Sequence, residues 1–324
     1  MENTKEDALF KGRSSRSCVK MGCSLYLSNF RRILKASWIP AAGFALCASV
    51  LGSIAVIQYP QLNLQAYVNP QSLPSLLESY LAVFVVSLLA LVVGGLAEAA
   101  TYSRAFDMLD HYNREGKMPN GGKWVQFSWR WAWRTLKAFF AAAVGEAVLA
   151  SVVTALFIVL KIAVNKVGGE ELIPQNMVWI PVAIALVPLS APLLYVLTKY
   201  ILDGKQSLWK SLWANYVVGM RHVGLLVVVI FAALVLVAVV SLFLTFPALV
   251  VAVANFQANF GVILGDPLGM PSYIVPLTAV TMAFAGFVEV MVRMVIFFIG
   301  YYAYGSIEAT ENEKNHFNEE IQNN

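Results

Sequence analysis

Long apolar runs separated by short polar segments form the dominant pattern of this chain. Six of the runs hold about 20 residues with hardly any charge, the length that an α-helix needs to cross a bilayer. Only helices and closed barrels satisfy their backbone hydrogen bonds in lipid, so the pattern predicts an all-α polytopic membrane protein. The six predicted transmembrane helices are residues 38–57, 79–103, 138–161, 177–200, 223–246 and 273–302.

A basic and aromatic segment, called a lead-in below, precedes the first, third and fifth predicted helices. The strongest lead-in belongs to residues 123–140, where four basic side chains share one helical stripe among Trp and Phe. Such a segment suits the headgroup layer of a bilayer, either as an anchor or as a site that recognises anionic lipid. The side chains predicted at the lipid interface are Lys123, Trp124, Trp129, Arg130, Trp131, Trp133, Arg134, Lys137, Trp209 and Trp213.

The same order of parts occurs three times: an amphipathic lead-in, an outward helix, an external loop and a return helix. This order predicts three repeated helical hairpins with interfacial amphipathic helices on the cytoplasmic side. The apolar residues 248–272 contain several Gly and Pro and are interpreted as an interfacial or re-entrant segment. The predicted parts are a disordered N-terminus (1–25), a membrane domain (26–306) with hairpin units 26–112, 118–204 and 205–306, and an acidic tail (307–324).

Charge gives the orientation of these helices. Twenty of the 23 Lys and Arg residues fall on the side of both termini, and only Lys161 and Lys166 fall on the other side. The positive-inside rule therefore predicts both termini in the cytoplasm, with the chain in the bacterial inner membrane. Hydrophobic residues make up 59% of the chain and the net charge is only +4, so nucleic acid is not an expected partner.

Four ionisable side chains remain inside the predicted membrane helices: Glu98, Glu146, Glu289 and Arg293. Each is costly in lipid unless it is paired, and Glu289 and Arg293 are four residues apart on one helix. The cluster would be a polar site that binds an anionic headgroup or relays protons. Alternatively, it is a buried charge network that fixes the positions of the helices.

Signals of catalysis are missing from the sequence. The three His residues lie outside the predicted membrane helices, and neither a phosphate-binding Gly-rich loop nor a Gly-x-Ser-x-Gly motif occurs. We therefore expect no catalytic residues, no metal site and no cofactor.

The three Cys residues have no disulfide or zinc spacing. We expect translation to start at Met1 or at Met21. The acidic tail is expected to be solvated, or else to dock on the lead-ins.

One segment carries a resemblance to a known family. Residues 201–216 read Ile-Leu-Asp-Gly-Lys-Gln-Ser-Leu-Trp-Lys-Ser-Leu-Trp-Ala-Asn-Tyr and are followed by Gly219 and an apolar helix. This pattern resembles the six-helix membrane region attached to some glycerophosphodiester phosphodiesterases and also found alone in uncharacterised bacterial inner-membrane proteins. The resemblance implies the six-helix fold over about residues 26–306. The soluble phosphodiesterase domain has no counterpart here, so that activity is not carried over.

Two hypotheses for function follow from these features. The first is a non-enzymatic envelope protein that binds membrane lipid, above all anionic lipid, or a partner membrane protein through its lead-ins. The alternative is a small transporter or lipid-moving protein that works through Glu98, Glu146, Glu289 and Arg293.

Overall fold

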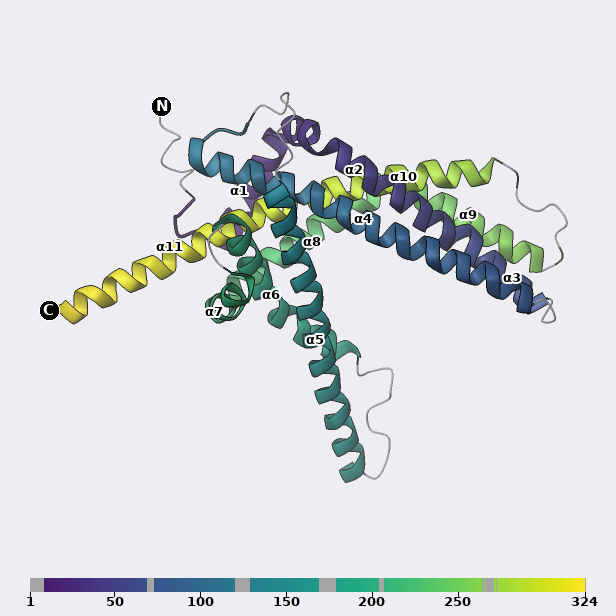
Figure 1. Ribbon diagram of the computed structural model, residues 1–324. Coiled ribbons are helices and arrows are strands. Elements are labelled where there is room, and N and C mark those ends of the chain that lie inside the picture. The colour runs from purple at the N-terminus through teal and green to yellow at the C-terminus, as the bar shows by residue number, and fades with distance from the viewer. Residues whose placement is uncertain are drawn as a thin grey trace.

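The computed structural model describes residues 9–68, 73–119, 129–168, 179–203, 207–263, 265, 271 and 273–323 (Figure 1). All regular structure in these ranges is helical. Six of the described helices are long and apolar enough to cross a membrane, which confirms the predicted all-α, multi-pass membrane class. They are Phe30–Asn63, Leu76–Glu115, Trp129–Lys166, Trp179–Asp203, Val223–Leu244 and Ile274–Gln322.

The N-terminal segment is helical where we expected disorder up to residue 25. Helix α1 (Ser15–Ser28) begins at Ser14, whose side chain accepts a hydrogen bond from the backbone of Ser17, and it buries one face that includes Cys18 and Gly22. A Cβ added at Gly22 would lie 2.6 Å from the backbone of Ile299, so the two helices touch almost backbone to backbone. The periodic small and apolar residues of α1 explain why this polar segment folds.

The first lead-in and the first membrane helix form one element, α2 (Phe30–Ser53). A short π-helical segment, η1 (Ile54–Gln58), joins α2 to α3 (Tyr59–Val68). We expected residues 59–78 to be a loop because of their prolines, but α4 (Leu73–Glu115) already begins within them. Pro74 occupies the second position of α4, where the missing backbone N–H costs nothing, whereas Pro60 directly follows η1 and removes one backbone hydrogen bond inside a continuous helix.

The second hairpin consists of α5 (Trp129–Gly168) and α6 (Trp179–Asp203), which pack against each other. The third lead-in is a separate helix, α7 (Leu208–Arg221), which ends at His222 before α8 (Val223–Leu244). Residues 246–263, which we interpreted as re-entrant or interfacial, form helix α9 (Phe246–Ile263). Helix α9 packs along α10 and α3, which gives its apolar residues a protein partner.

The last predicted membrane helix breaks at Met294 into α10 (Ile274–Arg293) and α11 (Val295–Asn323). Helix α11 continues through the acidic tail, where we expected a disordered end. Its first turns carry some of the most deeply buried aromatic side chains of the protein, including Phe298, Tyr301 and Tyr302. These residues belong to the main core, where α1, α6, α8 and α11 meet the C-terminal part of α4.

Figure 1 shows how the elements diverge from this core. Helices α2, α4, α9 and α10 lie side by side in one elongated bundle, and α3 lies at its far end. The α5–α6 hairpin leaves the core in a second direction, and the C-terminal part of α11 projects in a third. The repeated hairpin units predicted from the sequence therefore occupy different surroundings.

Candidate functional site

Three of the four predicted intramembrane charges come together. Arg293 Nε lies 2.6 Å from Glu289 Oε1 within α10, and Arg293 Nη1 lies 3.8 Å from Glu98 Oε1 on α4. Tyr102, one turn after Glu98, donates its hydroxyl to the same Glu98 oxygen at 2.8 Å. The arrangement holds two carboxylates on one guanidinium, so its main effect is to tie α4 to the end of α10.

The aromatic side chains beside this cluster explain its position. Tyr102 stacks at an angle on Phe297 of α11, with ring centroids 4.7 Å apart, and also contacts Phe139 of α5. This contact lies at the branch point where α5 leaves α4. The side chains of Arg293, Glu98 and Glu289 are 48%, 29% and 23% exposed, so the cluster lies at the edge of the packed core.

The fourth predicted member, Glu146, lies elsewhere on α5. It is close enough to α7 that its negative charge, after the larger effect of burial, raises the pKa of Tyr216. The Tyr216 hydroxyl donates to the backbone carbonyl of Leu189 in α6 at 2.7 Å. The predicted group of four is therefore a group of three, and Glu146 belongs to the surroundings of α7.

The predicted lipid-interface side chains divide into exposed and packed residues. Lys123 and Trp124 lie outside the described residues. Trp209 and Trp213 on α7 are 77% and 83% exposed, and Trp129 at the start of α5 is almost as open. Five further predicted side chains complete the α5 end of this set: Arg130, Trp133 and Lys137, which are exposed, and Trp131 and Arg134, which are partly buried.

Two of these side chains have a packing role that the sequence did not reveal. The Arg134 guanidinium lies 4.3 Å from the centre of the Tyr200 ring and donates a hydrogen bond to the Tyr200 carbonyl near the end of α6. Trp131 packs into a small cluster that includes Phe106 and Ile201. A cation at a helix C-terminus satisfies carbonyls that have no partner inside the helix, so Arg134 stabilises the α5–α6 contact.

Helix α7 has the reverse of an ordinary amphipathic pattern. Its buried face carries the small or polar residues Ser211, Asn215 and Gly219, and Asn215 donates to the Ser211 hydroxyl at 2.9 Å. A Cβ at Gly219 would lie 2.9 Å from the Pro192 side chain of α6, so this close packing requires glycine. Trp209 and Trp213 consequently face away from the protein, whereas Tyr216 packs toward α6.

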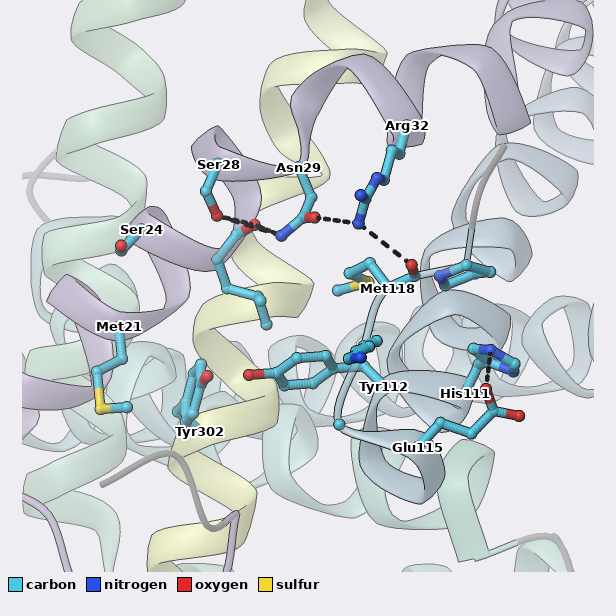
Figure 2. A pocket seen from close by; sticks show the side chains of 14 residues that line it. Met21, Ser24, Ser28, Asn29, Arg32, His111, Tyr112, Glu115, Met118 and Tyr302 are labelled. Atoms are coloured by element: carbon cyan, nitrogen blue, oxygen red, sulfur yellow. Dashed lines mark hydrogen bonds and ion pairs between the residues drawn. The ribbon is translucent and has the colours of Figure 1, made fainter. Parts of the chain in front are cut away.

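A polar pocket of about 700 Å³ lies between α1, the start of α2, the end of α4 and α11 (Figure 2). Arg32 points into it and donates through Nη1 to Asn29 Oδ1 at 3.3 Å and to the Met118 carbonyl at 3.2 Å. On the opposite wall, His111 Nε2 lies 2.9 Å from Glu115 Oε2. We did not predict this pocket, because its walls come from three segments that lie about 80 or more residues apart in sequence.

A second set of contacts joins the start of the acidic tail to the core and to the third lead-in, which is the docking alternative that the sequence left open. Glu308 lies 2.6 Å from Lys199 Nζ in α6 and accepts a hydrogen bond from the Tyr195 hydroxyl. Glu311 lies 2.8 Å from His222 at the α7–α8 junction and 3.9 Å from Arg221 of the third lead-in. The start of the tail thus docks on the protein. The signal available in the sequence was the run of acidic residues directly after an apolar helix.

Among the described residues, no group of three or more His, Cys, Asp or Glu side chains could hold a metal ion. Comparison of the chain with protein-family models, with curated proteins and with solved structures gave no match. The resemblance of residues 201–216 to a phosphodiesterase-associated membrane region therefore stays a prediction.

Proposed function

We propose that this chain is a non-enzymatic protein of the bacterial inner membrane that binds anionic lipid through its basic and aromatic lead-ins. Both termini would lie in the cytoplasm, as the distribution of Lys and Arg predicts. The proposal concerns the surface of the protein at the headgroup layer. A partner membrane protein on the same surface is the other form of this hypothesis, and the experiment below separates the two.

One observation carries the proposal. Helix α7 buries its small polar face against α6 and turns Trp209 and Trp213 almost fully outward. Exposed Trp is unfavourable in water but is favoured at the membrane interface, where the ring is apolar and the indole N–H can bond to headgroups or water. Lys210 is exposed on the same helix, and Arg130 and Lys137 are exposed at the start of α5. Cations in this layer attract anionic headgroups.

The test removes two exposed cations from the start of α5, where Lys137 also lies 5.2 Å from the centre of the Trp133 ring. Arg130→Gln combined with Lys137→Gln avoids Arg134, which stabilises the end of α6. At about 1 kcal/mol for each cation, the double variant should lose roughly thirtyfold in preference for anionic over zwitterionic lipid. Native mass spectrometry of protein in micelles doped with both lipids measures this preference.

The matched control is Lys161→Gln combined with Lys166→Gln, which removes the same charge from the opposite end of α5. This control should keep the wild-type preference. An equal loss in both double variants, or no loss in either, would overturn the lead-ins as the lipid site. A second protein retained in place of lipid would favour the partner form of the hypothesis.

The transporter alternative has one observation in its favour, namely the convergence of Glu98, Glu289 and Arg293. Ion pairing within the cluster and the separate position of Glu146 make this the weaker candidate. Arg293→Gln protein reconstituted in vesicles distinguishes the two functions. A lost ion or lipid flux with unchanged lipid retention would support transport.

A further inference from the structure

Helices α1 and α2 meet at Asn29, and this junction is called the α1–α2 elbow below. The polar pocket lies on one side of the elbow, and an apolar groove of about 440 Å³ lies on the other. Its walls come from α1, the start of α2, α8, α10 and α11, and they are almost entirely apolar. Leu27, Phe30 and Leu244 are exposed at its rim. Its volume falls in the range of small-molecule sites, about 300–1,000 Å³.

The groove wall contains one hydroxyl, and that hydroxyl is satisfied. Tyr26 donates to the backbone carbonyl of Met291 at 2.7 Å, which joins α1 to α10 behind the groove. The wall therefore offers a polar ligand nothing to bond, whereas an apolar chain could lie against it without leaving a polar group unpaired. Water is a poor occupant of such a site for the same reason.

Basic side chains lie directly beside this apolar wall. On α2, Phe30 and Leu34 line the groove, and the next residue after each is an exposed cation, Arg31 and Lys35. Arg31 and Lys35 are four residues apart and so share one helical stripe, which Trp38 extends by a further turn. An apolar channel flanked by two cations and a Trp has the chemistry of an anionic amphiphile.

The third cation of this part of α2, Arg32, does not face the groove. Arg32, which is rotated to the other flank of α2, points into the polar pocket and is bonded to Asn29 and Met118 (Figure 2). The elbow thus separates a polar cavity from an apolar one. Only Arg31 and Lys35 of this basic run remain on the outer side of the groove.

We propose that the groove holds one acyl chain of an anionic phospholipid, with the phosphate of its headgroup on Arg31 and Lys35. This inference rests on the proposed lipid-binding function and assigns it a specific site. It differs from the lead-in surfaces of α5 and α7, because here the chain as well as the headgroup contacts the protein.

The test uses full-length protein with phosphatidylglycerol and phosphatidylcholine of identical chains, measured by native mass spectrometry. Val240→Trp places an indole in the groove and should remove one bound phosphatidylglycerol per protein. Val235→Trp is the matched control, since Val235 is exposed on the same helix but does not line the groove. Arg31→Gln with Lys35→Gln should lower the preference for phosphatidylglycerol roughly tenfold or more.

A second measurement needs no variant. Phosphatidylglycerol with a photoreactive group midway along one chain should label residues 236–244 or 287–295 of the wild-type protein. The groove site alone is overturned by the following result. The wild-type protein retains phosphatidylglycerol, neither Val240→Trp nor the Arg31→Gln, Lys35→Gln change reduces this retention, and these segments are not labelled. No preference for phosphatidylglycerol in the wild type overturns the proposed function as well. A dimer mass without lipid would assign the groove to a second copy of the chain.

Discussion

Arg293 is the residue on which the intramembrane charge cluster depends. It contacts a carboxylate on its own helix and another on α4, at 2.6 Å and 3.8 Å. Without the guanidinium, Glu98 and Glu289 would face each other with no cation between them. Like charges at short range in an apolar medium are strongly unfavourable, so loss of the guanidinium should weaken the contact between α4 and α10.

This dependence predicts a measurable coupling between Arg293 and its partners. A double-mutant cycle of Arg293→Gln with Glu289→Gln should give about 1 kcal/mol in the free energy of unfolding, since the pair is partly exposed. The cycle with Glu98→Gln should give less, because that distance is longer. The control cycle uses Glu146→Gln, which should show coupling below about 0.5 kcal/mol. Equal coupling to Glu146 would contradict the observed geometry.

Cys18 reports on the packing of α1. The residue is fully buried, and burial raises the pKa of its thiol from 9.0 to about 11, although the charge of Arg13 acts in the other direction. Thiolate is the reactive form, so below pH 9 its fraction falls about a hundredfold from this shift alone. Maleimide should therefore label Cys18 slowly in folded protein, more than a hundredfold below a free thiol.

The comparison for this labelling is made with two single-cysteine proteins. One keeps Cys18, and the other carries Lys20→Cys, which lies two residues away on the exposed face of α1. The Lys20→Cys protein should react rapidly at pH 7 in detergent. Equal rates for the two positions would mean that α1 is not packed against α11.

At the residue scale, the sequence predicted contacts within a helix better than contacts between helices. Glu289 and Arg293 are four apart, and their ion pair forms as the spacing indicated. Whether Glu98 or Glu146 joined them depended on the angle at which α5 leaves α4, and no local pattern encodes that angle. Arg134 shows the same limit, because its partner Tyr200 lies on another helix.

Among the elements, the sequence predicted helix bounds best for apolar helices that do not continue into a polar helical segment. Residues 223–246 were predicted as a helix, and α8 spans Val223–Leu244. Helix α4 has 43 residues, about 65 Å at 1.5 Å per residue, roughly twice the hydrocarbon thickness. Hydropathy marks only the part of such a helix that enters lipid. The polar continuation of α4 and the first turns of that of α11 are stabilised by packing and ion pairs, which hydropathy does not report.

Helix α11 offers a direct test of that stabilisation. Removing residues 313–324 deletes an exposed part of the helix and should change the melting temperature little. Removing residues 308–324 also deletes Glu308 and Glu311, and it leaves Lys199 without its carboxylate at 2.6 Å. Loss of one partner costs about 3–5 kcal/mol for a fully buried ion pair and at most about 1 kcal/mol for an exposed one, so loss of this half-buried pair should cost an amount between the two and lower the melting temperature.

The point variant Glu308→Gln separates charge from helix length. It should reproduce much of the loss seen in the longer truncation, because Lys199 and Glu308 are each only 18% exposed. Thermal unfolding in one detergent, followed by the same optical signal for all variants, measures the series. Identical melting temperatures for the two truncations would show that the ion pair contributes nothing.

On the scale of the whole molecule, the class of protein was clear from hydropathy and its arrangement was not. The sequence predicted six membrane-crossing helices, and six of the described helices meet the length and composition needed. The three repeated hairpins stay a prediction, and the described helices of the three units pack in different surroundings. Helices α2, α4, α9 and α10 form one bundle, while α5 and α6 branch away as a separate hairpin (Figure 1).

This divergence leaves much apolar surface facing outward, including the large side chains of α5 and α8. Exposed apolar area on this scale requires a lipid environment. Polar and basic side chains gather near the branch point, around the α1–α2 elbow and the lead-ins of α5 and α7. If the chain binds lipid as proposed, its headgroup contacts would lie around these segments.

The most direct test of the account is the lipid that the wild-type protein carries out of its own membrane. Protein extracted gently and analysed by native mass spectrometry should retain anionic phospholipid well above its share of the membrane. The Arg130→Gln, Lys137→Gln protein should carry less of it at equal stability. Retained lipid that simply mirrors the membrane composition, identical in both proteins, would contradict the proposed function.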